Sequence, residues 1–203
     1  MKHRRFLLLC AAMTAILSVT PIHGFAQDDD VSDETFHEGV KADQDFRVDP
    51  ELQRQVKIGF KIAPVPLNLQ DKSEVLVGLG SYLVNAVGGC NDCHTNPSFA
   101  ANGNPFMGQP KKINVAGYLA GGQQFGPGIV SRNLTPENGL PAGRTFAQFK
   151  QILRTGIDLD KATPQYGPLL QVMPWPDYQS MGNRDILAIY TYLSAIPAIT
   201  PAE

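Results

Sequence analysis

The sequence predicts an all-α domain in which three main helices are joined by long loops. Apolar residues recur at helical spacing in three segments, and no segment shows a convincing strand pattern. The stretch 95–144 between the first two helical segments is rich in glycine, proline and asparagine. A loop of about fifty residues is unusual inside a compact domain, so we expect a large rigid ligand to organise it.

The first two predicted helices have recognisable starts and stops. Apolar residues repeat with helical spacing over 74–88, after Ser73 as a candidate N-cap and before a pair of glycines. The second helix is predicted over 145–155, with Thr145 as its cap and Gly156 as its stop. The stretch G-G-C-N-D-C-H therefore begins where the first helix ends.

The third helix is predicted near the C-terminus. It covers 183–195, with Asn183 as its N-cap and Pro197 as its terminator. Within the long loop over 95–144, the only regular structure we expect is a short turn-linked pair of strands near 113–129.

The first 26 residues are typical of a cleaved secretory signal peptide. Residues 1–5 are basic, and residues 6–19 form an uncharged run of 14 residues, shorter than the roughly 20 needed to cross a bilayer. Small residues precede Gln27, so cleavage is expected after Ala26. An uncleaved membrane anchor is the alternative. With cleavage, the protein is exported to the periplasm and keeps no membrane span.

Residues 27–72 form an acidic extension ahead of a domain over 73–203. The stretch 27–51 carries ten acidic and two basic side chains, a composition typical of a partly disordered or loosely attached segment. Docking on a basic partner or on its own domain is the alternative. Removal of residues 1–26, with three basic and no acidic side chains, lowers the formal net charge from −2 to −5. This charge argues against nucleic acid as a partner.

The motif C-N-D-C-H is the attachment pattern of c-type haem. Cys90 and Cys93 are spaced to form thioethers with two porphyrin vinyl groups, and His94 follows as an axial iron ligand. We therefore predict one covalently attached haem c. A zinc site would need further ligands, and His37 is the only other histidine after the leader. A thioredoxin-like dithiol would need a βαβ setting, which the pattern does not show.

The second axial ligand decides what such an iron can do. The candidates are Met107, Met173, Met181 and His37. Met173 is favoured because the prolines on either side of Trp175 stiffen the loop that carries it. The other methionines are more typical of packing residues, and the histidine lies in the acidic extension, so the four stay open on this ground alone.

Several stretches together resemble class I c-type cytochromes. The chain is similar to the mono-haem units of bacterial periplasmic cytochrome c subunits of dehydrogenases in G-S-Y-L-V-N-A-V-G-G-C-N-D-C-H-T, G-I-V-S-R-N-L-T-P-E-N-G-L, T-F-A-Q-F-K-Q-I-L-R-T-G and M-P-W-P-D-Y. The resemblance covers about 74–197. It implies a cytochrome c-like fold wrapped around the haem, thioethers at Cys90 and Cys93, and axial ligation by His94 and Met173.

The resemblance also implies contacts away from the iron. It suggests that the first helix packs on the last near the haem edge, with Gly80 and Tyr190 as candidate contact residues. Asn133 and Thr135 are expected at the polar rim of the haem. The residues 27–72 have no counterpart in this pattern, so the resemblance assigns them no role.

In function, the resemblance implies an electron carrier rather than an enzyme. Iron held on both faces by side chains is expected to accept electrons from a dehydrogenase and pass them to the respiratory chain, through a terminal oxidase or another cytochrome. The alternative is a haem enzyme or sensor with an open or labile sixth position, similar to a small peroxidase. Such a site would want a distal acid–base group, and no histidine is well placed for one.

Overall fold

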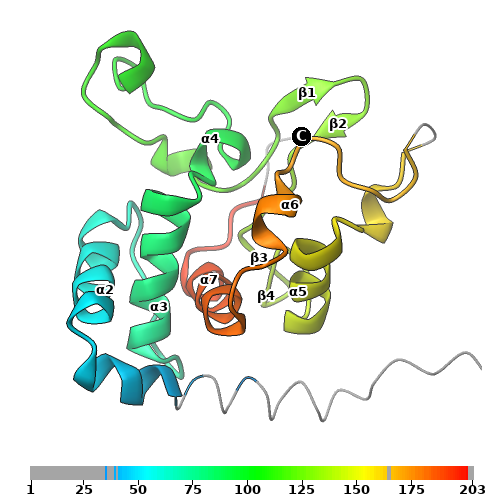
Figure 1. The fold of residues 1–203 in the computed structure, drawn as a ribbon. Helices are drawn as coiled ribbons and strands as arrows, with labels where there is room; N and C mark the ends of the chain where they lie inside the picture. Colours follow the sequence, from blue (N-terminus) through cyan, green and yellow to red (C-terminus); the bar gives the residue numbers. More distant parts are fainter. Residues whose placement is uncertain (1–34, 36–38, 40, 164–165, 201–203) are drawn as a thin grey trace, which may run out of the picture.

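The computed structural model describes residues 35, 39, 41–163 and 166–200, and this part of the chain is mostly helical (Figure 1). The predicted signal peptide over 1–26 lies outside the described residues. No helix among the described residues has the length and apolar character that a bilayer span requires.

The regular elements are short. The α-helices are α2 (Pro50–Ile62), α3 (Glu74–Tyr82), α4 (Asn91–His94), α5 (Phe146–Thr155), α6 (Trp175–Tyr178) and α7 (Asn183–Ala195). The strands are β1 (Gln124–Gly126), β2 (Ile129–Val130), β3 (Pro136–Glu137) and β4 (Leu140–Pro141). A π-helix, η1 (Leu83–Val87), continues α3, and 3₁₀ turns lie at η2 (Pro105–Met107), η3 (Val115–Gly117) and η4 (Leu159–Lys161).

The first predicted helix is present, but its last turns are wider than those of an α-helix. The hydroxyl of Ser73 accepts a hydrogen bond from the backbone of Leu76 (3.3 Å), which caps α3. From Leu83 onward the chain winds as the π-helix η1, and the Gly88 N–H donates to the Leu83 carbonyl (2.7 Å). The helical segment therefore ends at the glycine pair, as predicted.

The second and third predicted helices are α5 and α7. Thr145 and Gln148 form a reciprocal capping box, and Gly156 ends α5 with a φ of +69°, a conformation that favours glycine. The prediction of Asn183 as the cap of α7 is wrong. Gly182 occupies the N-cap position, and the Asn183 side chain accepts a hydrogen bond from the guanidinium of Arg154 (3.0 Å).

Helix α3 lies between α2 and α7 and packs on both (Figure 1). Gly80 allows the close approach to α7, because a Cβ built there would lie 1.9 Å from the Ala188 carbonyl oxygen and 2.7 Å from the Tyr192 Cβ. Gly80 thus lies in the predicted contact between the first helix and the last. The ring of Tyr190, also on α7, packs edge-on against Phe146 of α5, and its hydroxyl donates to the Arg144 carbonyl.

The acidic extension contributes helix α2 to this packing. Asp49 caps the helix by accepting from the backbone of Glu51 (2.9 Å), and Leu52 and Val56 are buried. A Cβ at Gly59 would lie 1.8 Å from a carbonyl of α3, so the two helices are in close backbone contact. This part of the extension thus packs on the three-helix domain, and the domain boundary between residues 72 and 73 stays a prediction.

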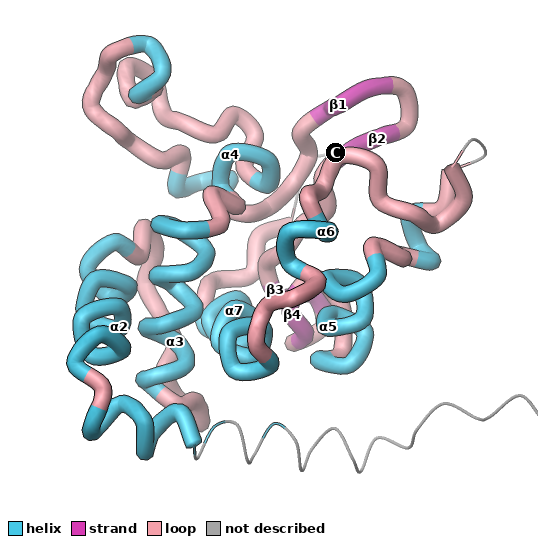
Figure 2. Tube along the Cα trace, in the orientation of Figure 1, coloured by secondary structure: helices cyan, strands magenta, loops and turns pink. Residues whose placement is uncertain are grey.

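The long loop is organised by two short antiparallel hairpins and by a projecting lobe (Figure 2). The hairpin β1–β2 lies at the end of the region where strands were expected, and the hairpin β3–β4 was not predicted. The lobe, over 96–114, leaves the domain after α4 and returns through paired backbone hydrogen bonds between Ala100, Gly103 and Lys112.

Candidate functional site

One helical turn carries the two thiols and the imidazole. Gly89, with a φ of +57°, lies between η1 and Cys90, and Cys90 is the N-cap of the four-residue helix α4 (Asn91–His94). The His94 N–H donates to the Cys90 carbonyl (2.9 Å), which closes this turn. Both cysteines are free thiols in the structure. The spacing of the motif therefore brings three reactive side chains to one place.

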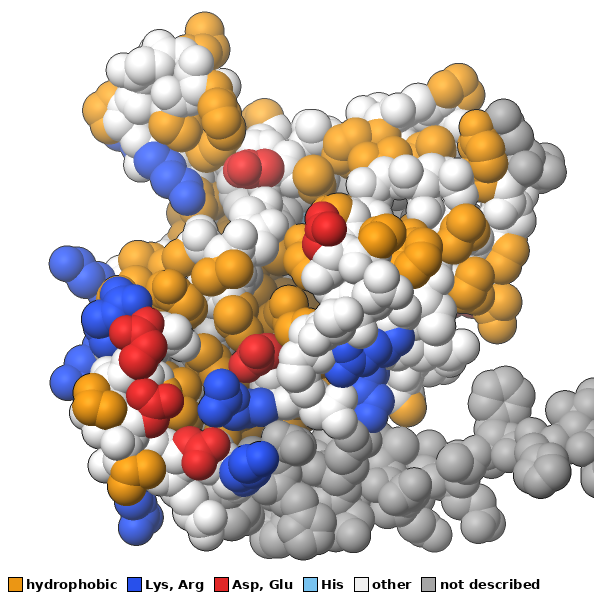
Figure 3. Space-filling model, viewed as in Figure 1, with side chains coloured by type: hydrophobic (Ala, Val, Ile, Leu, Met, Phe, Trp, Pro, Cys, Tyr) orange, Lys and Arg blue, Asp and Glu red, His pale blue; other side chains and the backbone are white. Residues whose placement is uncertain are grey.

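These side chains line a cavity of about 450 Å³ whose walls are mainly apolar. The apolar wall comes from η1, the β1–β2 hairpin, α5, α7 and the segment before α6. In the space-filling view, hydrophobic side chains gather over α3 and over β1–β2 (Figure 3). A second hollow, of about 470 Å³, lies in the lobe and contains none of these sulfur or imidazole groups. The first cavity is the site that the chemistry favours.

The imidazole of His94 has a defined hydrogen-bonding state. Its Nδ1 lies 2.8 Å from the carbonyl oxygen of Arg132. A carbonyl can only accept, so Nδ1 carries the proton, and Nε2 of the neutral ring has a free lone pair. Burial lowers the pKa of His94, which favours the neutral ring. Neutral imidazole is the form that binds a metal.

The thiols are poorly suited to dithiol redox chemistry. Burial raises the pKa of the Cys90 thiol to about 12, and burial together with Asp92 raises the pKa of Cys93. Thioredoxin-like cysteines need a lowered pKa, because the thiolate is the nucleophile. The environment of the two thiols therefore argues against that alternative.

Two of the four candidate ligands opposite His94 lie on the cavity. Met173 and Met181 both line it and pack against the hydrophobic core. Met107 is 72% exposed at the tip of the lobe and does not line this cavity. His37 lies outside the described residues. The tertiary structure thus reduces the choice among the described candidates to two methionines.

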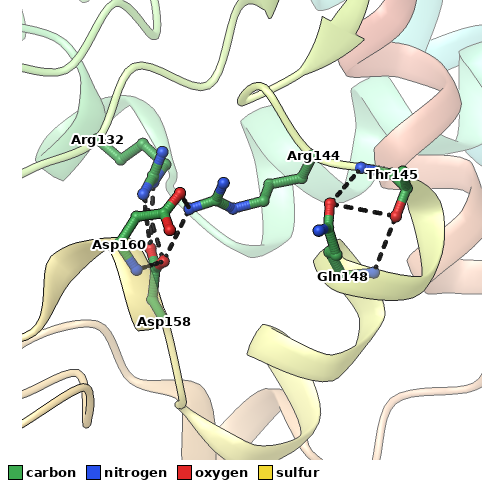
Figure 4. A network of polar contacts seen from close by, with 6 residues as sticks. All are labelled: Arg132, Arg144, Thr145, Gln148, Asp158 and Asp160. Carbon is green, nitrogen blue, oxygen red and sulfur yellow. Dashed lines mark hydrogen bonds and ion pairs between the residues drawn. The ribbon is translucent and has the colours of Figure 1, made fainter. Parts of the chain in front are cut away.

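The cavity wall also carries a group of charges that the sequence did not predict. Arg132 and Arg144 line the cavity together with Asp158, and both guanidiniums donate to this carboxylate, at 3.0 and 2.9 Å (Figure 4). Asp160 adds a more exposed carboxylate to Arg144. The three lining residues come from separate segments, so no spacing in the sequence could reveal the group. The only sign of this group in the sequence is that Arg132 lies in S-R-N-L-T, which belongs to a stretch that resembles class I c-type cytochromes.

Asn133 and Thr135 are not among the residues that line this cavity, and their expected place at the polar rim of the haem stays a prediction. The Asn133 side chain donates to the carbonyl of Ile199 (2.9 Å), and the Thr135 hydroxyl donates to the Asn133 side chain (2.8 Å). Both residues are buried. They fasten the segment that follows α7 to the loop before β3.

Comparison with known proteins agrees with this chemistry. The chain is 33% identical over 135 residues to the cytochrome c subunit of alcohol dehydrogenase (quinone) of Gluconacetobacter polyoxogenes, and equally to that of Komagataeibacter europaeus. The match covers 66% of this chain and 24% of each relative. The likeness supports a cytochrome c-like protein. This chain spans about a quarter of the length of these relatives. No protein-family model matches it.

Proposed function

We propose that this chain is a periplasmic mono-haem c-type cytochrome that transfers electrons and is not itself an enzyme. The observation that carries the proposal is the convergence of two thiols, a neutral imidazole and two thioethers on one apolar cavity. This set of groups can attach a haem and ligate its iron from both sides. The relatives named as cytochrome c subunits support the same assignment.

The cavity residues fit a haem. Cys90 and Cys93 would form the thioethers, and His94 would bind the iron through Nε2. The apolar walls suit the porphyrin faces, and the guanidiniums of Arg132 and Arg144 offer cationic partners for its two carboxylates. When bound, haem iron supplies one-electron chemistry between its ferric and ferrous states.

The protein's own residues would tune this chemistry in three ways. The Arg132 carbonyl orients the His94 ring and raises its donor strength through the hydrogen bond at Nδ1. Met173 would hold the iron through its thioether, which would favour the ferrous form and raise the reduction potential. The apolar walls limit the access of water to the site. With a protein side chain bound to the iron on each face of the haem, the iron would have no open position for a substrate.

A dehydrogenase is the electron donor that we propose. The relatives are subunits of a quinone alcohol dehydrogenase, and this chain matches about a quarter of each of them. We propose that it accepts electrons from a dehydrogenase and delivers them to the respiratory chain, through a terminal oxidase or another cytochrome. Export by a cleaved signal over 1–26 would bring the protein to the periplasm, where c-type haem is attached.

Absorbance spectroscopy tests the assignment. Export-competent expression should yield a red protein whose haem stays with the polypeptide in acidified acetone, because thioether bonds are covalent. The oxidised protein should show the weak band at about 695 nm that marks a methionine bound to ferric haem iron. A colourless protein would overturn the proposal.

Matched variants identify the ligand. Met173→Ala should abolish the band at about 695 nm and allow carbon monoxide to bind the reduced protein, because one axial position opens. Met181→Ala is the control, since Met181 lines the same cavity, and it should keep the band. Loss of the band in Met181→Ala, with the band kept in Met173→Ala, would instead identify Met181 as the ligand. Carbon monoxide binding by the unaltered protein would favour the enzyme or sensor with an open sixth position.

A further inference from the structure

Arg132 connects the proposed proximal ligand to a buried carboxylate. Its backbone carbonyl accepts the hydrogen bond from Nδ1 of His94 (2.8 Å). Its guanidinium donates to the Asp158 carboxylate through Nε (3.2 Å) and Nη2 (3.0 Å). One residue therefore contacts His94 with its main chain and Asp158 with its side chain.

Asp158 is held firmly in place. Its side chain is only 4% exposed, and it also accepts from Arg144 Nη2 (2.9 Å) and from the backbone N–H of Asp160 (3.2 Å). A buried carboxylate has lost its hydration, so it keeps these donors in a fixed arrangement. Figure 4 shows the two guanidiniums reaching this carboxylate from different segments of the chain.

The backbone around Arg132 is anchored on both sides, but the peptide that faces His94 lies between the anchors. The Ser131 N–H donates to the Gln123 carbonyl (2.9 Å), and the Leu134 N–H donates to the Leu119 carbonyl (2.8 Å). Between these points, the segment joining β2 to β3 has no regular structure. The ion pair of the Arg132 side chain is therefore well placed to fix the direction of its carbonyl.

We propose that Asp158 is a positioning residue for His94. By holding the Arg132 side chain, it keeps the Arg132 carbonyl on Nδ1 and so fixes the orientation and donor strength of the imidazole. Hydrogen bonds of this kind to a ligating histidine tune a metal site. The inference rests on the proposed function, because it takes His94 as an axial ligand of haem iron.

The test compares two aspartates in the haem-loaded full chain. Asp158→Asn weakens the contact with Arg132, whereas Asp160→Asn removes a charge of the same sign two residues away. Asp160 is 63% exposed, and its ion pair is with Arg144. The control therefore changes the net charge equally while it leaves the contact between Arg132 and Asp158 in place.

The readout is the solvent exchange of the His94 Nδ1 proton, followed by NMR in the reduced protein. Loss of the equivalent of one hydrogen bond predicts about tenfold faster exchange in Asp158→Asn, and a change within about twofold in Asp160→Asn. The backbone amide of Leu187, buried in α7, reports opening of the whole domain. Its exchange should stay unchanged in both variants.

A second variant, Arg132→Lys, separates the effect of the contact geometry from the effect of charge. It also tests the inference if Asp158→Asn does not fold. Arg132→Lys keeps the charge and the backbone carbonyl but loses the two-pronged contact, so it should also speed exchange at His94. Unchanged exchange in the haem-loaded variants, or equal acceleration at Leu187, would overturn the inference alone. A chain that binds no haem would overturn the proposed function as well.

Discussion

The close approach of α3 and α7 makes Gly80→Ala a demanding test of the packing. A Cβ at this position would lie 1.9 Å from the Ala188 carbonyl oxygen and 2.7 Å from the Tyr192 Cβ. Ordinary contacts begin at 3.4 Å, so the helices must move apart by about 1.5 Å at the crossing if nothing else yields. The opposing atom is backbone, which cannot rotate away as a side chain could.

The expected loss of stability follows from two opposing effects. Overpacking of a close-packed interface costs typically about 1–3 kcal/mol, and a clash with backbone belongs at the upper end of this range. Alanine regains about 1 kcal/mol over glycine inside a helix. The net prediction is a loss of about 2 kcal/mol in the free energy of unfolding. With a typical urea dependence, the unfolding midpoint should fall by about 1 M.

The assay is urea unfolding of the haem-loaded protein, followed by circular dichroism at 222 nm. Gly39→Ala is the control, because a Cβ built at this helical glycine would meet, among the described residues, only the Leu76 side chain, at 3.9 Å. That substitution should leave the midpoint unchanged or raise it slightly. A midpoint for Gly80→Ala equal to that of the control would refute the close contact between the two helices.

Three further predictions concern the surroundings of the cavity. Gly121→Ala should lower the free energy of unfolding by about 2 kcal/mol in urea unfolding, because φ is +76° and the Cβ would lie 2.6 Å from the Arg132 carbonyl oxygen. Tyr192→Phe should cost about 1–2 kcal/mol in the same assay, because it removes a buried hydroxyl 2.9 Å from the Tyr118 hydroxyl. Burial raises the pKa of Tyr178 from 10.0 to about 12. The tyrosine therefore ionises at a lower pH in the unfolded chain than in the folded one, so the free energy of unfolding should fall as pH rises from about 10 to about 12. Tyr178→Phe should lessen this fall.

Each of these predictions can fail clearly. Wild-type stability of Gly121→Ala would mean that the neighbouring carbonyl is not held close to residue 121. An unchanged midpoint for Tyr192→Phe would show that its hydroxyl contributes no net stability. For the third, the absorbance at 295 nm that is lost in Tyr178→Phe should come from the part of the titration near pH 12, and a loss confined to about pH 10 would contradict the raised pKa.

The helices could be predicted from the sequence because their ends are local. Thr145 with Gln148, and Gly156 at the stop, involve residues within one or two turns of each other, so their identities suffice. Asn183 was misassigned because its partner, Arg154, lies on another helix. The partners of Gly80 and Tyr190 were likewise set by how the helices pack, which single-residue patterns do not contain.

The candidate site likewise has one part that the sequence predicts and another that depends on the tertiary structure. Cys90, Cys93 and His94 are neighbours along the chain, so one helical turn brings them together whatever the rest of the protein does. The sequence alone therefore determined the haem-attachment hypothesis. The tertiary structure brought Met173 and Met181 to the same cavity and removed Met107 from it, but the choice of ligand stays a prediction.

The charged part of the cavity wall was decided by the tertiary structure alone. Arg132, Arg144 and Asp158 follow β2, β4 and α5 respectively, and no local pattern relates one to another. Local order depends on the dihedral preferences and hydrogen bonds of adjacent residues. Contacts between distant segments depend on the burial and loop closure of the whole chain. For this reason the sequence determined where the cofactor would attach, and only the fold decided which side chains surround it.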